Sequence, residues 1–127
     1  MKLVEFRARG AGQTTWCVFK AAQKVVEGKH VIVISENQDQ AREMCQQIYR
    51  VLTTCIPKSC LSKTLTTIRN APTKVCVTCI SNERTTRDIN FTRGIRNISL
   101  LVDLKHEQSD FTCELIEQMY IRKEEII

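Results

Sequence analysis

Val31-Ile32-Val33-Ile34 is the stretch that decides the fold class, because four consecutive β-branched apolar residues form an unbroken run. β-Branched side chains favour strands, and a strand with apolar residues on both faces belongs inside a sheet that is covered on both sides. Sheets of this kind are built from parallel strands joined by helices. The run therefore predicts a central parallel strand.

The segments on either side of this run have helical patterns. Residues 14–27 carry apolar side chains around most of the helix circumference, which predicts a helix buried beside the sheet and stopped by Gly28. After the run, Asn37 and Gln40 have the spacing of a helix cap, and Pro57 marks the end of a second helix. Its apolar positions recur at helical spacing: Ala41, Met44, Cys45, Ile48, Val51, Leu52 and Cys55.

The remaining segments predict more strands and one more helix. Residues 64–68 and 74–80 are rich in Thr and Val and flank a turn at 70–73, which is typical of a hairpin. Residues 3–6 and 98–103 are further apolar strand candidates. A final helix is expected from near Ser109 to the C-terminus, with these residues on its inner side: Phe111, Leu115, Ile116, Met119 and Tyr120.

Together these patterns predict one domain over residues 1–127. Helices alternate with apolar strands, so we expect an α/β fold of three layers, with a mostly parallel sheet flanked by helices on both faces. In such sheets ligands bind beyond the carboxyl ends of the strands. The ends of two predicted strands, near residues 7–15 and at Asp103, carry residues suited to phosphate and metal binding.

Composition excludes several classes of protein. With 43% hydrophobic residues, 26% charged residues, four Gly and two Pro, the chain is neither collagen-like nor disordered. It has no apolar run of about 20 residues, so we expect no membrane association, and a charge at Glu5 argues against an export signal. An intracellular location and seven reduced cysteines are therefore expected. The net charge of +5 suits either a phosphate-bearing partner or an ordinary solvated surface.

The loop Arg7-Ala8-Arg9-Gly10-Ala11-Gly12-Gln13-Thr14-Thr15 has the layout of a phosphate-binding loop between a strand and a helix. In the usual pattern a glycine is followed by four residues and then by Gly-Lys-Ser/Thr. Here Gly12 and Thr14 match, whereas Gln13 replaces the lysine and Arg7 replaces the first glycine. An ordinary glycine-containing turn is the alternative. The predicted nucleotide contacts are Arg9, Gly10, Ala11, Gly12, Gln13, Thr14 and Thr15.

A second signal lies at the end of the apolar run 98–103. In nucleotide hydrolases an aspartate at this place holds magnesium, and the glutamate that follows it polarises the attacking water. Asp103 occupies the first position, but Leu104 occupies the second. Thr14 and Asp103 are thus the predicted magnesium contacts.

Considered together, these segments resemble the ATPase domain of the large subunit of viral DNA-packaging terminases, most closely the herpesvirus type. The resemblance rests on four segments in the same order: 9–16, 31–50 with Gln40-Ala41-Arg42-Glu43, 92–96, and 97–107. It implies a P-loop NTPase-like fold, ATP with Mg²⁺ as cofactor, and a role in packaging double-stranded DNA. It further implies other terminase subunits and a capsid portal as partners, and the host nucleus as the compartment.

The same resemblance predicts weak or lost ATP hydrolysis. Gln13 and Leu104 stand at the two positions that normally supply the phosphate-binding charge and the water-polarising acid. The family's nuclease domain is not expected within 127 residues. The chain is then a weakly active or inactive ATPase domain, or a fragment of a longer motor.

Alternatives remain open at this point. A helicase-like motor domain shares the phosphate loop and the acidic strand, and a non-catalytic remnant that binds protein or DNA shares the fold. In either motor, four arginines are candidate contacts to a nucleic-acid backbone: Arg84, Arg87, Arg93 and Arg96. The spacing of four cysteines approaches that of a zinc ribbon: Cys55, Cys60, Cys76 and Cys79. Positions three apart on a strand, such as Cys76 and Cys79, point to opposite faces, so we do not expect zinc.

Overall fold

The computed structural model describes residues 13–84, 95–105 and 107–127. In chain order the elements are α1 (Gln13–Val26), β1 (His30–Ser35), α2 (Gln38–Cys55), a short 3-10 helix (Lys58–Cys60), β2 (Leu61–Lys63), β3 (Thr67–Asn70), β4 (Val75–Ser81), β5 (Ile98–Asp103), α3 (Asp110–Ile121) and β6 (Glu125–Ile126). The predicted strand at 3–6 lies outside the described residues, as do residues Arg9 to Gly12 of the loop.

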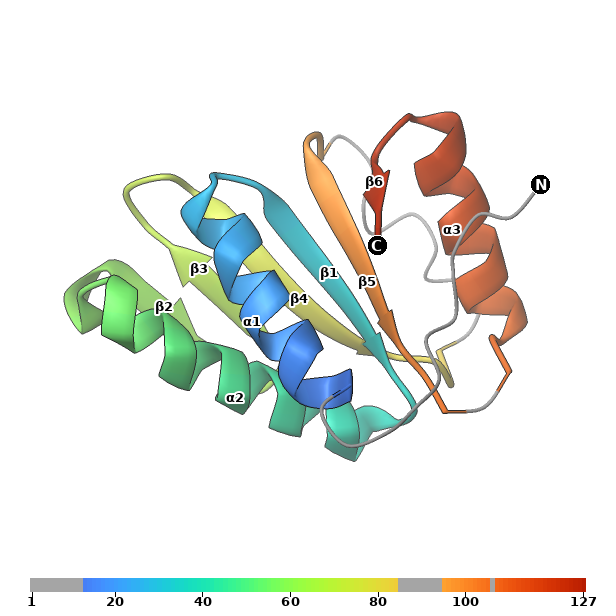
Figure 1. The fold of residues 1–127 in the computed structure, drawn as a ribbon, viewed down its shortest axis with the longest axis horizontal. Coiled ribbons are helices and arrows are strands. Elements are labelled where there is room, and N and C mark those ends of the chain that lie inside the picture. Colours follow the sequence, from blue (N-terminus) through green and yellow to red (C-terminus); the bar gives the residue numbers. More distant parts are fainter. Residues whose placement is uncertain (1–12, 85–94, 106) are drawn as a thin grey trace.

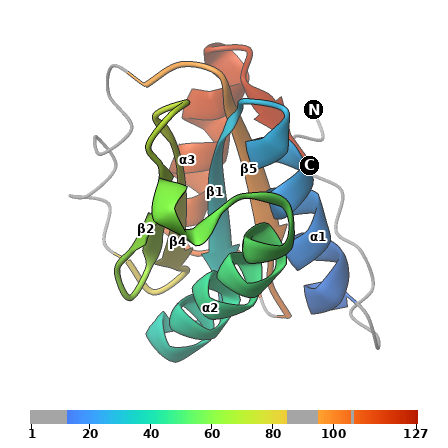
Figure 2. The ribbon, with the colours of Figure 1, turned by 90° about the vertical axis from the view of Figure 1, so that its left-hand side faces the viewer.

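The described strands form a six-stranded sheet in the order β2-β3-β4-β1-β5-β6. β1 lies at its centre and runs parallel to both β4 and β5, and β6 is parallel to β5. β2 and β3 extend the sheet by antiparallel pairing beside β4. Helices α1 and α2 cover one face and α3 covers the other (Figures 1 and 2). The prediction of an α/β fold with a mostly parallel sheet between helices is confirmed.

The apolar run in β1 is buried on both faces, as its composition requires. Val31 and Val33 belong to the core beneath α1 and α2, which also contains Leu101 of β5. Ile32 and Ile34 belong to the core beneath α3. Side chains alternate between faces along a strand, so one four-residue run contributes to both cores.

Local signals in the sequence account for the predicted helix ends. The Asn37 side chain caps α2 by accepting a hydrogen bond of 2.9 Å from the Gln40 amide, and Ser109 caps α3 by accepting one of 3.2 Å from the Thr112 amide. Gly28 follows α1 with a φ of +87°, a conformation that glycine adopts at little cost. These residues mark where α2 and α3 begin and where α1 ends.

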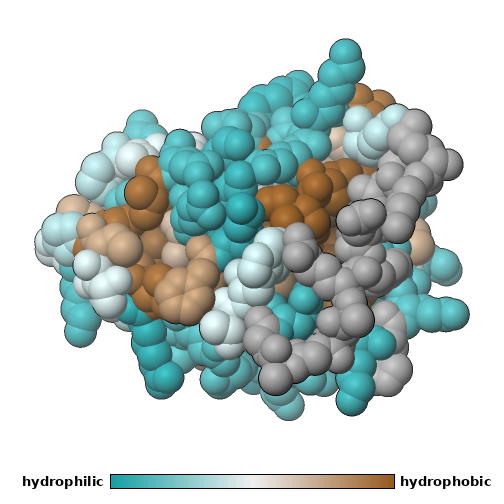
Figure 3. Space-filling model, in the orientation of Figure 1, coloured by the Kyte–Doolittle hydropathy of each residue, from teal (hydrophilic) through white to brown (hydrophobic). Residues whose placement is uncertain are grey.

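Two expectations about α1 and α3 are wrong in detail. The α1 side chains Phe19 and Val26 are 58% and 60% exposed, because the helix packs on the sheet through one face only. Figure 3 shows hydrophobic residues reaching this side of the molecule in separate patches between hydrophilic ones. Tyr120, expected on the inner side of α3, is 43% exposed.

The C-terminal segment also departs from the prediction. The last helix ends at Ile121, and the chain turns through Lys123, with a φ of +59°, into the short strand β6. The Glu125 carboxylate of β6 accepts hydrogen bonds from Lys24 at 2.7 Å and Lys29 at 2.9 Å, and from the Ser99 hydroxyl. These contacts come from α1, the turn after it and β5, so nothing in the local sequence predicts β6.

Candidate functional site

The structure brings Thr14 and Asp103 together at the carboxyl edge of the sheet. The Thr14 hydroxyl donates a hydrogen bond of 3.1 Å to Oδ2 of Asp103 across 89 residues of chain. The N-terminus of α1 lies at this edge, beside the end of β5 (Figure 1). Asp103 is only 3% exposed, while Thr14 is half-buried.

Strand alternation explains the direction of the Asp103 side chain. Leu101, two residues earlier, lies in the core beneath α1 and α2, so Asp103 points to that same face. A buried carboxylate needs polar partners, and the N-terminus of a helix is a favourable place for a negative charge. The first turn of α1 contains no acidic side chain of its own. Hydroxyl and carboxylate oxygens are ligands that suit Mg²⁺, and the backbone amides at a helix N-terminus suit a phosphate group.

Two serines extend this polar edge across neighbouring strands. In the strand register Ser35 of β1 pairs with Asp103 on one side and with Ser81 of β4 on the other. The Ser81 hydroxyl accepts a hydrogen bond of 2.9 Å from the Glu83 amide. The Ser35 hydroxyl is buried and has no hydrogen-bond partner within the described ranges. Neither serine belongs to a motif that is recognisable in the sequence.

Gln13 and Leu104, which replace the usual residues of the two motifs, lie in different surroundings. The Gln13 amide lies along α1, with its Nε2 3.9 Å from the Sγ of Cys17. Leu104 is buried in the core beneath α3 with Phe111, on the opposite face from Asp103. A carboxylate at position 104 would therefore lie among apolar side chains. Thr15, also a predicted contact, is exposed beside Thr14 at the start of α1.

Glu36 is a second acid at the same edge, and sequence reasoning missed it. It follows Ser35 directly, and its carboxylate accepts a hydrogen bond from the backbone amide of Lys105. Glu36 thus ties the loop after β1 to the loop after Asp103. A polar residue immediately after an apolar parallel strand is the only sequence signal for it.

Asn82 fixes the loop after β4 against the start of α3. Its side-chain oxygen accepts hydrogen bonds from the Ser109 amide at 3.0 Å and the Thr112 hydroxyl at 2.7 Å, and its amide donates to the Glu107 carbonyl at 3.1 Å. Its backbone amide donates to the Ser35 carbonyl at 2.7 Å. One buried side chain therefore orders the loops on the α3 side of the edge.

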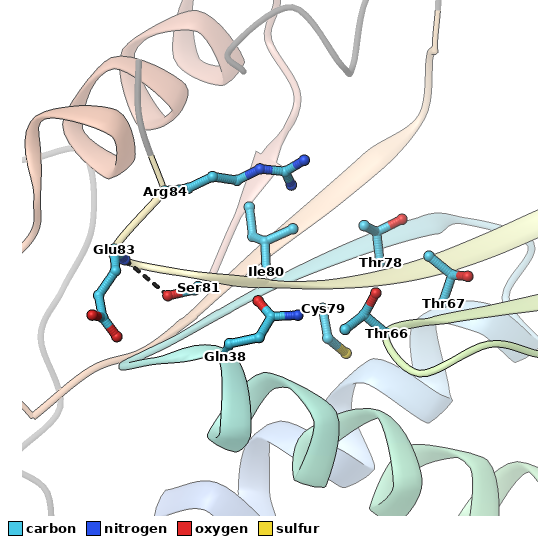
Figure 4. A pocket seen from close by; sticks show the side chains of 9 residues that line it. All are labelled: Gln38, Thr66, Thr67, Thr78, Cys79, Ile80, Ser81, Glu83 and Arg84. Atoms are coloured by element: carbon cyan, nitrogen blue, oxygen red, sulfur yellow. Dashed lines mark hydrogen bonds between the residues drawn. The ribbon is translucent and has the colours of Figure 1, made fainter. Parts of the chain in front are cut away.

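A cavity of about 520 Å³ lies at the carboxyl end of β4, across β1 from Asp103. Figure 4 shows Arg84 extended over one face of β4 and Gln38, from the start of α2, directed towards the other. Most of the remaining lining is polar: Thr66, Thr67, Thr78 and Ser81, with Cys79, Ile80 and Glu83. This cavity does not include Thr14 or Asp103.

The predicted arginine contacts do not form one group. Arg84 follows the carboxyl end of β4, whereas Arg96 precedes the amino end of β5. Both strands run parallel to β1, so these two arginines lie at opposite edges of the sheet. Arg87 and Arg93 lie outside the described residues.

The cysteines considered for zinc lie in different environments. Cys79 is buried beneath α2, Cys76 is half-buried on the other face of β4, and Cys55 is exposed. Within the described ranges no three His, Cys, Asp or Glu side chains are grouped to hold a metal ion. Of the helices in those ranges, none has the length and apolar character to cross a membrane.

Comparison of the chain with known protein families, curated proteins and solved structures finds no match.

Proposed function

We propose that this chain is a nucleotide-binding domain that holds ATP with Mg²⁺ at the carboxyl edge of its sheet. The observation that carries the proposal is the hydrogen bond between Thr14 and Asp103. The phosphate-loop pattern and the acidic-strand pattern were identified independently, 89 residues apart, and their key side chains lie within hydrogen-bond distance of each other. The fold of an α/β sheet brings helix starts and strand ends to the same edge, and the hydrogen bond adds that the two side chains named by the motifs contact each other there.

The residues present fit a hydrated magnesium ion. Mg²⁺ is commonly bound through one or two carboxylates, keeps several waters and takes substrate phosphates as further ligands. Asp103 and Thr14 supply hard oxygens, and the N-terminus of α1 supplies backbone amides for a phosphate group. Bound Mg²⁺ would neutralise phosphate charge, which is the contribution that Gln13 cannot make in place of lysine.

Within this class, the terminase-like ATPase of viral DNA packaging is the specific function that we propose. The support is the sequence resemblance, together with the parallel sheet and the meeting of the two motifs. Its hydrolysis is expected to be weak or absent, because Gln13 carries no charge and Leu104 is buried away from Asp103. Double-stranded DNA, further terminase subunits and a capsid portal are the proposed partners, and the host nucleus is the proposed compartment.

Calorimetric titration with a non-hydrolysable ATP analogue, with and without Mg²⁺, tests the proposal. Binding should require Mg²⁺, weaken at least tenfold in Asp103→Asn and strengthen in Gln13→Lys, which restores the usual charge at the phosphates. Asp110→Asn, at an exposed acid that begins α3, is the matched control and should bind as the original chain does.

Failure would be visible in the same experiment. Absence of binding by the original chain and by Gln13→Lys, with all proteins folded, would reject nucleotide binding and leave a fold that serves another purpose. If the affinity for the analogue is the same with and without Mg²⁺, and is unchanged in Asp103→Asn, the nucleotide binds at another site.

A helicase-like motor or a DNA-binding remnant is the second candidate. The cavity beside Arg84 favours it, because a cation and several hydroxyls around one hollow suit a backbone phosphate. Salt-sensitive preference for single strands would favour the helicase-like function, and preference for duplex would favour packaging.

A further inference from the structure

Among the described residues at the carboxyl edge, Ser35 is the one with a buried polar side chain that has no hydrogen-bond partner. Its side chain is 1% exposed, and its hydroxyl has no hydrogen-bond partner among the residues that the structure describes. A buried hydroxyl without a partner costs about 1–3 kcal/mol relative to a paired one. An alanine would avoid this cost without changing the strand.

The position of Ser35 indicates what its hydroxyl faces. Ser35 pairs with Asp103 in the parallel register of β1 and β5. Two residues earlier, Val33 and Leu101 also pair and both lie beneath α1 and α2, so the Ser35 and Asp103 side chains share that face. Neighbouring strands are about 4.8 Å apart. Ser35 is therefore the strand neighbour of Asp103, whose carboxylate accepts the hydrogen bond from Thr14, and the Ser35 hydroxyl makes no hydrogen bond to that carboxylate.

Three oxygen-bearing side chains, from α1, β1 and β5, thus lie at one edge of the sheet: Thr14 and Asp103 are joined by a hydrogen bond, and Ser35 makes no hydrogen bond to either of them. One is a carboxylate and two are hydroxyls, which are the hard oxygen donors that Mg²⁺ and Mn²⁺ prefer over nitrogen or sulfur. A site with a single carboxylate leaves most of the coordination sphere to water and phosphate. Those waters need hydrogen-bond partners in the protein.

We propose that Ser35 is the third protein oxygen of the divalent-cation site and holds one water molecule of the hydrated ion beside Asp103. This inference rests on the proposed function and deepens it, since it adds a residue that neither sequence motif contains. Ser81, one strand further from Asp103, has the same residue type on the same face, but its hydroxyl is already bonded to the Glu83 amide. Of the two serines, Ser35 is the one whose hydroxyl is unbonded within the described ranges and lies on the strand beside Asp103.

The test is a Mn²⁺ titration followed by the paramagnetic resonance signal of free Mn²⁺, with and without the non-hydrolysable ATP analogue. Ser35→Ala should weaken Mn²⁺ binding about tenfold or more, as expected when a residue that orients metal ligands or waters is lost. Ser35→Cys keeps the volume and replaces the hard oxygen by sulfur, so it should weaken binding similarly. Ser81→Ala is the matched control and should leave Mn²⁺ binding unchanged.

Thermal unfolding of the same proteins separates binding from folding. Without metal, Ser35→Ala should be at least as stable as the original chain, because the lost hydroxyl leaves no described partner behind. Mn²⁺ should raise the melting temperature of the original chain more than that of Ser35→Ala.

Two results would overturn the inference while sparing the proposed function. Either Ser35→Ala binds Mn²⁺ as tightly as the original chain while Asp103→Asn does not, or Ser35→Cys retains full affinity. Unchanged Mn²⁺ affinity in Ser35→Ala would mean that the Ser35 hydroxyl binds a buried water molecule that has no part in the cation site. If Asp103→Asn also left Mn²⁺ and nucleotide binding unchanged, both the inference and the proposed function would fail.

Discussion

The Thr14 hydroxyl and the Asp103 carboxylate, 89 residues apart, are joined by a hydrogen bond of 3.1 Å. It ties the first turn of α1 to the last residue of β5 and directs a buried negative charge at a helix N-terminus. The contact serves folding as well as the proposed binding, because the carboxylate would otherwise lose a donor inside the protein. Variants at these positions therefore need a stability measurement beside every binding measurement.

Thr14→Ala should lower the free energy of unfolding by about 1–2 kcal/mol, because a hydrogen bond to a buried charged group is lost. Thr14→Ser keeps the hydroxyl and should recover most of the loss. Urea denaturation gives the values, and Thr54→Ala, at an exposed position of α2, is the control for removing a threonine from a helix. Equal stability of Thr14→Ala and the original chain would show that the hydrogen bond contributes nothing to folding.

Restoring the usual motif residue should give a stable protein at position 13 and an unstable protein at position 104. Gln13 is half-buried at the start of α1, so Gln13→Lys should fold with a melting temperature close to that of the original chain. Leu104 is buried with Phe111 and Leu115, so Leu104→Glu should cost about 3 kcal/mol or more by placing a carboxylate in an apolar core. Leu104→Met is the control of similar volume.

A folded, stable Leu104→Glu protein would contradict this prediction, because it would mean that the side chain at 104 reaches solvent. Thermal unfolding by circular dichroism separates these outcomes. The expected result would mean that the weak hydrolysis proposed for this chain cannot be restored by substitution at position 104 alone.

Much of the fold follows from local sequence. The run 31–34 identifies the central strand, Asn37 identifies the start of α2, and the turn at 70–73 separates β3 from β4. Each of these features depends on neighbouring residues. β6 could not be predicted, because its two residues form a strand through pairing with β5, and Glu125 binds Lys24 and Lys29, about a hundred positions earlier in the chain.

The residues of the candidate site also fall into those that a sequence motif predicts and those that none predicts. Thr14 and Asp103 carry motif signals, and their roles in binding stay predictions. Ser35 and Glu36 carry none, because a serine or glutamate after an apolar strand is an ordinary strand end. Only the register of β1 beside β5 shows that Ser35 adjoins Asp103.

Acid should weaken the attachment of the C-terminus. Burial alone favours the neutral form of Glu125, but hydrogen bonds from Lys24, Ser99 and Lys29 outweigh it and lower the pKa of this carboxyl to about 2. The folded state thus has the lower pKa, so the stabilisation is complete above the ordinary value of 4.5 and is lost as the pH falls from 4.5 towards 2.

Stability measured by urea denaturation between pH 6 and pH 2, a window set by the pKa of Glu125, should therefore fall less steeply in Glu125→Gln than in the original chain. Glu117→Gln, at an exposed glutamate of α3, controls for the change in net charge. An unchanged pH dependence in Glu125→Gln would show that the contacts to Lys24 and Lys29 do not govern acid stability.

Arg84, of the arginines that the structure describes, lines a cavity suited to a nucleic-acid phosphate. It lines a cavity of about 520 Å³ together with Thr67 and Thr78, and it follows β4 at the same edge of the sheet as Asp103 (Figure 4). Hydroxyls beside a guanidinium add hydrogen bonds to the charge attraction, as in many phosphate contacts. Glu83 also lines the cavity and opposes a phosphate, so Glu83→Gln should strengthen binding while Arg84→Ala weakens it.

The salt dependence of duplex DNA binding, measured by fluorescence anisotropy, gives a sharper result than affinity alone. One phosphate contact contributes about 0.9 to the slope of log affinity against log salt, so Arg84→Ala should reduce the slope by about 1. Arg50→Ala, at an exposed arginine of α2 outside the cavity, should leave the slope unchanged. Equal slopes for Arg84→Ala and Arg50→Ala would show that the cavity does not contact the nucleic acid, because the loss of one positive charge anywhere on the surface would then explain both slopes.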